Sequence, residues 1–115
     1  AIVRIAEDDF ESYSGTRLVA PNFAAAWFFE ETEPIVSRAL GGLSDAGIDA
    51  GLGHYAFCTN GSGTAGRLGI PTIGFGPGDE ELAHRVDEYI EIADLERGAR
   101  GYAAIALALL KGEGE

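Results

Sequence analysis

His84 stands within a run of acidic residues, and this is the pattern in the chain closest to a metal site. The acids lie on both sides of it, at Asp79, Glu80, Glu81, Asp87 and Glu88. A carboxylate can hold one ring nitrogen of a histidine and leave the lone pair of the other nitrogen for a metal. Solvated acids beside an exposed histidine would give the same pattern. One histidine cannot fix a metal, and no second candidate stands at a ligand interval, so spacing alone favours the surface interpretation.

Two glycine-rich loops are the other places where chemistry could occur. They are TNGSGTAG, residues 59–66, and GPGDEELAH, residues 76–84. Each follows a predicted strand, and in α/β sheets the functional loops lie beyond the carboxyl ends of strands. Glycine N–H groups can approach a ligand closely, and a helix starting near Ser62 would direct its positive end toward an anion such as a carboxylate. TNGSGTAG matches neither the P-loop nor the dinucleotide fingerprint, so taken alone these loops are more simply tight turns.

The remaining reactive side chains are weaker candidates. Cys58 is the single cysteine, which excludes an internal disulfide and a cysteine-based zinc cluster. No His or Lys accompanies it in a recognisable motif, so we expect it to pack as a small hydrophobic residue. His54 falls inside a predicted strand and is expected to be a packing or surface residue.

Strands and helices alternate along the chain and would position these loops. Strands are expected over residues 2–6, 13–19, 54–58 and 70–75, with a bend near Gly15. Helices are expected over 34–46, 62–68 and 95–111, the first two closed by Gly47 and Gly69 and the last capped by Asp94. Residues 21–33, rich in aromatic and acidic side chains, are read as a packed connector. The alternation predicts an α/β layer in which strands joined through helices are parallel.

Composition narrows the function classes. Nineteen acidic residues against 8 basic ones give a formal charge of −11, which disfavours binding to nucleic acid and anionic lipid. No apolar run is long enough to span a membrane and no signal-peptide pattern is present, so a soluble, cytoplasmic protein is expected. The length allows one domain or part of one. A strand-like run starts at Ile2, as if the sequence were cut from a longer one.

The run from Cys58 to Leu110, CTNGSGTAGRLGIPTIGFGPGDEELAHRVDEYIEIADLERGARGYAAIALALL, resembles the end of M20-type metallohydrolases. This group includes acetylornithine deacetylases, succinyl-diaminopimelate desuccinylases and related peptidases. The chain is most similar to its YgeY-like branch, hydrolases ascribed to selenium metabolism, through Thr-Asn-Gly, GIPTIGFGPGDE and AHRVDE. YSG at 13–15 and the connector leading into EPIVSRAL also fit. The most specific stretch is 70–90.

The resemblance implies a fold and a role for each matching residue. The fold would be the C-terminal portion of a zinc-peptidase-like (phosphorylase/hydrolase-like) α/β domain over 21–115, preceded at 1–20 by the last strand of a lid or dimerisation domain and the return crossing. His84 matches the last metal ligand of the family's AHxxxE motif, and Glu88 matches the acid that supports that ligand without coordinating. Thr59, Asn60 and Gly61 match the loop that lines the substrate pocket.

The parts that are missing matter equally. Relatives carry a His-x-Asp, a Glu-Glu pair with the general base, and another acid ligand before the lid, and none of these has a counterpart in residues 1–115. A dinuclear site holding two zinc ions, or another divalent metal, needs about five protein ligands. We therefore expect no catalytic residue in this chain and no tight metal binding by it alone.

Two functions follow from this sequence. The first is a fragment, inactive alone, of a zinc-dependent hydrolase that cleaves the amide or peptide bond of an N-acyl amino acid or small peptide. The alternative is a non-catalytic small α/β domain that binds a ligand or associates with itself. In both, a homo-oligomer is expected, because an incomplete sheet leaves an unpaired edge and an exposed apolar face.

Overall fold

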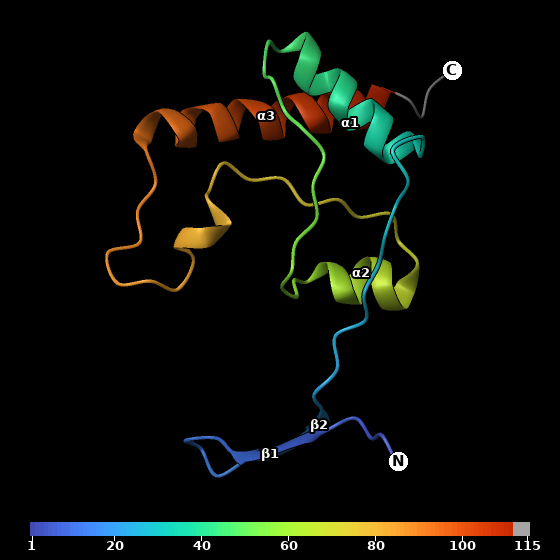
Figure 1. Ribbon diagram of the computed structural model, residues 1–115, viewed down its shortest axis with the longest axis vertical. Helices are drawn as coiled ribbons and strands as arrows, with labels where there is room; N and C mark the ends of the chain where they lie inside the picture. Colours follow the sequence, from blue (N-terminus) through green and yellow to red (C-terminus); the bar gives the residue numbers. More distant parts are fainter. Residues whose placement is uncertain (112–115) are drawn as a thin grey trace. The chain divides into compact units, whose positions relative to one another are not determined.

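The structure is a computed structural model that describes residues 1–111. The chain divides into two compact units. Unit 1 contains Ala1–Trp27 and Cys58–Ile70, and unit 2 contains Phe28–Phe57 and the chain from Pro71 onward. Figure 1 shows the elements of each unit. The prediction that residues 1–20 belong to a lid domain and 21–115 to a catalytic domain stays a prediction.

A β-hairpin forms the first part of unit 1. Strand β1 (Glu7–Glu11) pairs antiparallel with β2 (Arg17–Pro21), with Phe10 opposite Leu18. Gly15, at φ 80°, lies in the turn between them, where a side chain would disfavour the backbone conformation. The predicted return of the chain near Gly15 is confirmed. Both strands lie further along the chain than predicted, because their residues are exposed on both faces and no apolar face fixes their limits.

An exposed ion pair joins the two strands of the hairpin. Nε of Arg17 donates to Oδ1 of Asp9 at 2.8 Å, and the Arg17 guanidinium lowers the pKa of the Asp9 carboxyl below its ordinary value. In the ladder Arg17 lies opposite Glu11, so Asp9 and Arg17 are diagonal neighbours, a position where oppositely charged side chains can stabilise strand pairing.

Helix α2 (Gly61–Leu68) completes unit 1. It ends at Gly69, which adopts the left-handed conformation at φ 67° and donates its N–H to the carbonyl of Ala65. The predicted helix 62–68 and its glycine stop are therefore confirmed. Residues 23–27 of the connector pack on this helix, as described below.

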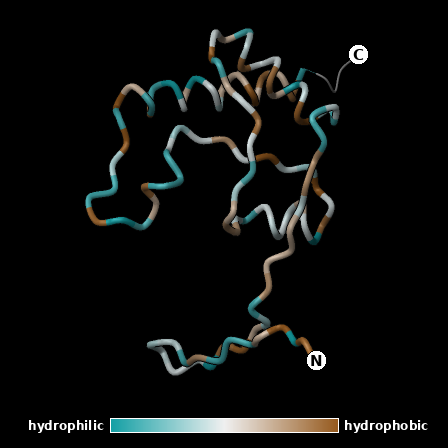
Figure 2. Tube along the Cα trace, viewed as in Figure 1, coloured by the Kyte–Doolittle hydropathy of each residue, from teal (hydrophilic) through white to brown (hydrophobic). Residues whose placement is uncertain are grey.

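Two helices form the core of unit 2. Helix α1 (Pro34–Asp45) packs against α3 (Ile92–Leu110), and Ala39, Leu43, Ile48 and Ile105 are the buried cluster between and beside them. The helices approach closely at Gly42, where an added Cβ would lie 2.7 Å from the Cβ of Ala108. Along both helices in Figure 2, hydrophobic and hydrophilic residues are interspersed, as expected for helices with one covered face.

The starts and stops of these helices follow local signals, with one exception. Pro34 occupies the first turn of α1, and Gly47, at φ 71°, follows its end as predicted. The assignment of Asp94 as the cap of the last helix is wrong, since α3 begins at Ile92 with Glu91 as its N-cap. Asp94 instead lies in the first turn, 3.0 Å from Arg97, where its charge complements the helix dipole.

The predicted strands at 54–58 and 70–75 do not form. Within residues 1–111 the β1–β2 hairpin is the only sheet, so the parallel α/β sheet expected from the sequence is not seen there. A strand requires a neighbour with which to exchange backbone hydrogen bonds, and neither segment has one among the described residues. Cys58, at the end of the first segment, is exposed, so the expectation that it packs as a small hydrophobic residue is also wrong. His54 is exposed as well.

Candidate functional site

The loop that carries His84 is anchored on helix α3 at its first residues. The hydroxyl of Tyr102 donates to the carbonyl of Phe75, and the two rings contact edge to face with centroids 5.2 Å apart. Two residues further on, the ring of Pro77 covers Gly98, where an added Cβ would lie 2.9 Å from the Pro77 Cγ. Glycines at 98 and 101 thus let α3 approach the loop's first residues closely.

A short 3-10 helix, η1 (Glu80–Leu82), follows this anchored segment. Oδ1 of Asp79 accepts a hydrogen bond from the Glu81 N–H at 2.9 Å and so caps the turn. Oε1 of Glu80 accepts from the Ala56 N–H at 3.3 Å, which ties η1 to residues 55–57. Two of the acids that surround His84 in the sequence therefore shape the loop.

His84 lies at a turn of the loop where the backbone is left-handed. Its φ is 62°, in the left-handed region that residues other than glycine seldom adopt. Its main-chain N–H donates to Oε2 of Glu88 at 3.0 Å. Asp87, also at φ 62°, turns the chain back so that the Glu88 carboxylate can reach His84. Both His84 and Glu88 are exposed.

The structure thus brings together the two residues that the sequence linked, and defines how they touch. Glu88 accepts a hydrogen bond from the main-chain N–H of His84, and the imidazole takes no part in this bond. A residue in this conformation projects its side chain from a tight turn, and strained backbone of this kind clusters at functional sites. The role of His84 as a metal ligand and of Glu88 as its support stay predictions.

The described residues do not by themselves assemble a metal site. Among residues 1–111 no group of three or more His, Cys, Asp or Glu side chains is arranged to hold an ion. Three of the acids around His84 accept hydrogen bonds from main-chain N–H groups, namely Asp79, Glu80 and Glu88.

The second predicted site, the loop at 59–61, belongs to unit 1. Oγ1 of Thr59 accepts from the Gly61 N–H at 3.1 Å, which closes a tight turn before helix α2. Asn60 is the N-cap residue, and its side chain makes no capping hydrogen bond. Thr59 and Asn60 are exposed while Gly61 is buried. Thr59, Asn60 and Gly61 therefore form one local turn, and their role in substrate binding stays a prediction.

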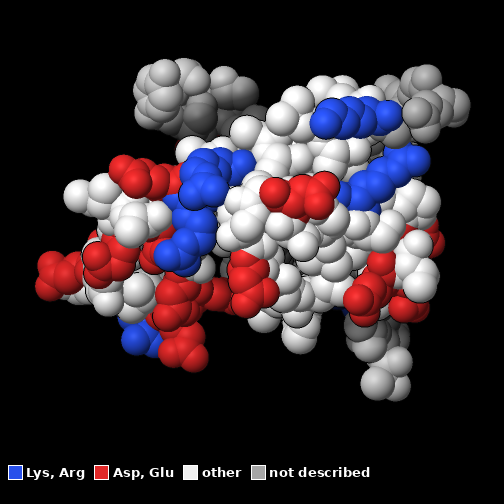
Figure 3. Space-filling model, turned by 90° about the horizontal axis from the view of Figure 1, so that it is seen from above, with Lys and Arg blue, Asp and Glu red and all other residues white. Residues whose placement is uncertain are grey.

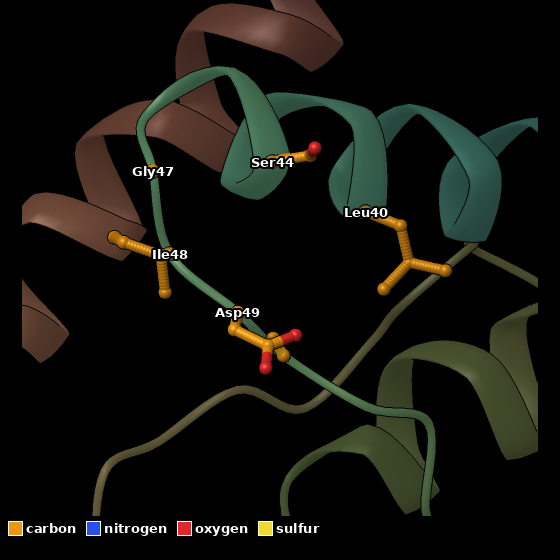
Figure 4. Close-up of a pocket in the computed structure, with 6 residues that line it drawn as sticks. Leu40, Ser44, Gly47, Ile48 and Asp49 are labelled. Carbon is orange, nitrogen blue, oxygen red and sulfur yellow. The ribbon is translucent and has the colours of Figure 1, made fainter.

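Two open pockets occur in unit 2. The larger, of ≈ 460 Å³, lies beside the end of α1 and is lined by Leu40, Ser44, Gly47, Ile48, Asp49 and Ala50 (Figure 4). The smaller, of ≈ 140 Å³, is lined by residues from the start of the His84 loop and from the segment that leads into α3, namely Pro77, Asp79, Leu82, Tyr89, Ile90, Glu91 and Asp94. Neither pocket is lined by His84.

On the face in Figure 3, acidic side chains are spread widely, with Lys and Arg side chains among them.

Comparison with known proteins identifies the family. The chain matches peptidase family M20/M25/M40 over residues 18–108, which includes both the turn at 59–61 and the His84 loop. The chain belongs to this family. The resemblance drawn from AHRVDE and GIPTIGFGPGDE is thereby confirmed.

Two curated relatives extend the match to nearly the whole chain. The proteins YgeY of Escherichia coli K12 and of Escherichia coli O157:H7 are each 35% identical over 117 aligned positions. The alignments cover 98% of this chain and 28% of either relative. The chain thus spans little more than a quarter of the length of the relatives it matches. No solved structure matches it.

Within residues 1–111, no helix is both long and apolar enough to cross a bilayer.

Reasoning from the sequence did not predict that Trp27 lies against the turn at 59–61. Trp27 contacts Gly61, directly beside the Thr59–Asn60 turn. The sequence offered one signal, since Trp27 is the single tryptophan and lies in the aromatic connector. Connector residues show no periodicity, however, so nothing local indicated its partner.

Proposed function

We propose that this chain is part of a zinc-dependent hydrolase that cleaves the amide or peptide bond of an N-acyl amino acid or small peptide. Membership of the M20/M25/M40 peptidase family supports hydrolysis, and peptidases of this family are usually metal-dependent. The observation that carries the proposal is His84 in its matching motif, at a strained turn fixed by Glu88. Zinc is the favoured metal, and another divalent ion is the alternative.

The chain's own residues would have limited roles in that enzyme. His84 would supply one ligand, Glu88 would hold its main chain, and Thr59 and Asn60 would orient the substrate. When bound, a metal of this kind activates water and polarises a carbonyl. The remaining ligands and the general base would come from sequence outside these 115 residues. We propose that this chain alone is inactive.

A chimera tests this function directly. The segment of E. coli YgeY that precedes its match would be joined to Ala1 of this chain, and hydrolysis of N-acetyl amino acids and dipeptides would be measured with and without zinc. We expect zinc-dependent activity that His84→Ala reduces by at least about a hundredfold, as loss of a unit of the catalytic apparatus does. Cys58→Ala is the matched control and should keep full activity. Activity that survives His84→Ala, or that needs no metal, would refute the proposal.

Self-association without catalysis is the second candidate, and exposed apolar side chains favour it. On α3 the side chains of Leu95, Tyr102, Leu107 and Leu110 are 52–70% exposed. Large exposed apolar surfaces mark sites that a partner covers. We propose that the 115-residue chain forms a dimer or larger species, and size-exclusion chromatography with light scattering measures this. A monomer at micromolar concentration that binds no hydrophobic dye would refute self-association.

A further inference from the structure

We propose that Trp27 is a positioning residue that fixes the turn formed by Thr59, Asn60 and Gly61. The importance of this turn for substrate rests on the proposed function, but its geometry does not. The proposal comes from three contacts between the connector segment 23–27 and helix α2, all within unit 1.

The first contact is between Trp27 and Gly61. A Cβ added to Gly61 would overlap Cη2 and Cζ2 of the Trp27 indole, so the ring lies directly on the glycine backbone. Gly61 is buried as a result. Its φ is not positive, so close approach rather than backbone conformation requires glycine at this position.

The second and third contacts hold the rest of the segment along the helix. A Cβ added to Gly66 would lie 2.7 Å from the carbonyl oxygen of Ala25 and 2.8 Å from its Cβ. Nη2 of Arg67 donates to the carbonyl of Phe23 at 3.0 Å. The segment therefore runs opposite to the direction of α2, with residues 27, 25 and 23 meeting residues 61, 66 and 67 in turn.

These contacts determine where the exposed residues of the turn lie. The Gly61 N–H is held by Oγ1 of Thr59 at 3.1 Å, and Asn60 lies between the two. Fixing Gly61 under the indole therefore fixes the backbone on both sides of Asn60.

The test uses two glycines of the same helix. Gly61→Ala places a methyl group against the indole, whereas Gly63→Ala places one where no atom lies within 4 Å. Because Trp27 is the single tryptophan, all tryptophan fluorescence comes from the ring that contacts Gly61 and reports its environment. We expect Gly61→Ala to shift the emission to longer wavelength, to increase quenching by acrylamide, and to move the NMR signals of Thr59 and Asn60. Gly63→Ala should leave all three unchanged. Equal behaviour of the two variants would overturn the proposal.

A second variant distinguishes displacement of the indole from general unfolding. Trp27→Phe removes the part of the ring that meets Gly61, so the double variant Gly61→Ala, Trp27→Phe makes room for the added methyl group. We expect the Thr59 and Asn60 signals to return toward their wild-type positions in the double variant. Signals that stay displaced would show that the indole does not set the turn. The fluorescence and NMR readouts measure the geometry of the turn, so their outcome is independent of any assay of hydrolysis.

Discussion

The carboxylate of Glu88 accepts a hydrogen bond from the main-chain N–H of His84, with Oε2 and N 3.0 Å apart. This contact closes a turn whose two left-handed residues, His84 and Asp87, both have φ 62°. A carboxylate beside a metal-binding histidine commonly accepts a hydrogen bond from the second ring nitrogen. Here the acid instead holds the histidine's backbone in an unfavourable conformation.

The first prediction concerns this hydrogen bond. Glu88→Ala should speed hydrogen exchange at the His84 amide by about fivefold, the factor expected for a bond worth about 1 kcal/mol. Glu88→Gln, which keeps an acceptor oxygen, should show a smaller increase. Glu81→Ala, another exposed acid of the same loop, serves as the control. NMR-detected exchange measures all three, and an unchanged His84 rate in Glu88→Ala would contradict the role assigned to Glu88.

The second prediction concerns the crossing of α1 and α3. At Gly42 an added Cβ would lie 2.7 Å from Ala108 Cβ and 2.8 Å from the Ala104 carbonyl oxygen, so Gly42→Ala should force the helices apart. We expect a loss of roughly 1–3 kcal/mol in unfolding free energy, typical of overpacking. At Gly41 no atom lies within 4 Å, and alanine there should stabilise the helix by roughly 0.5–1 kcal/mol. Urea denaturation followed by circular dichroism compares them, and similar values for the pair would contradict the close crossing.

Local signals predicted the helices well and the strands poorly. Pro34, Gly47 and Gly69 mark helix limits because their backbone preferences act at the residue itself. Asp94 was wrongly predicted to be the N-cap of the last helix, because an acid stabilises the first turn of a helix as well as its cap position. The apolar runs at 54–58 and 70–75 have strand composition, but a ladder also needs a partner segment, and residue types cannot show whether one is present.

The candidate site was predictable through motif and not through geometry. His84 and Glu88 were identified by their match to a family pattern, and spacing alone had favoured an exposed histidine. That Glu88 reaches the main chain depends on the left-handed conformations at 84 and 87. Histidine and aspartate adopt this conformation more often than most residues other than glycine, but still too seldom for the residue types to predict it. The contact of Trp27 with Gly61 joins residues 34 positions apart, and no pattern in the sequence around either residue indicates it.

The third prediction concerns pH and the hairpin. The Arg17 guanidinium lowers the pKa of Asp9, so the carboxylate is favoured in the folded hairpin. A lowered folded-state pKa stabilises the fold above the unfolded pKa, and this contribution is lost as pH falls through the folded value. NMR titration of the Asp9 carboxyl should give a midpoint below the ordinary value for aspartate. In Arg17→Gln the midpoint should return to the ordinary value for aspartate. An Asp9 midpoint that is the same with and without Arg17 would contradict the ion pair.

The last prediction concerns zinc and the isolated chain. Among residues 1–111 no group of three or more potential ligands is arranged around an ion, and His84 is exposed. A single exposed imidazole binds zinc weakly, because tight protein sites are built from three or four ligands. Isothermal titration of the 115-residue chain should therefore show affinity far below the roughly 10 kcal/mol or more of structural zinc sites. His84→Ala should weaken the residual binding, whereas His54→Ala, the matched loss of an exposed histidine, should leave it nearly unchanged. A tight stoichiometric site would contradict the need for outside ligands. If it disappeared in His84→Ala, the co-ligands would have to be sought within this chain, beginning with the acids at 79–81.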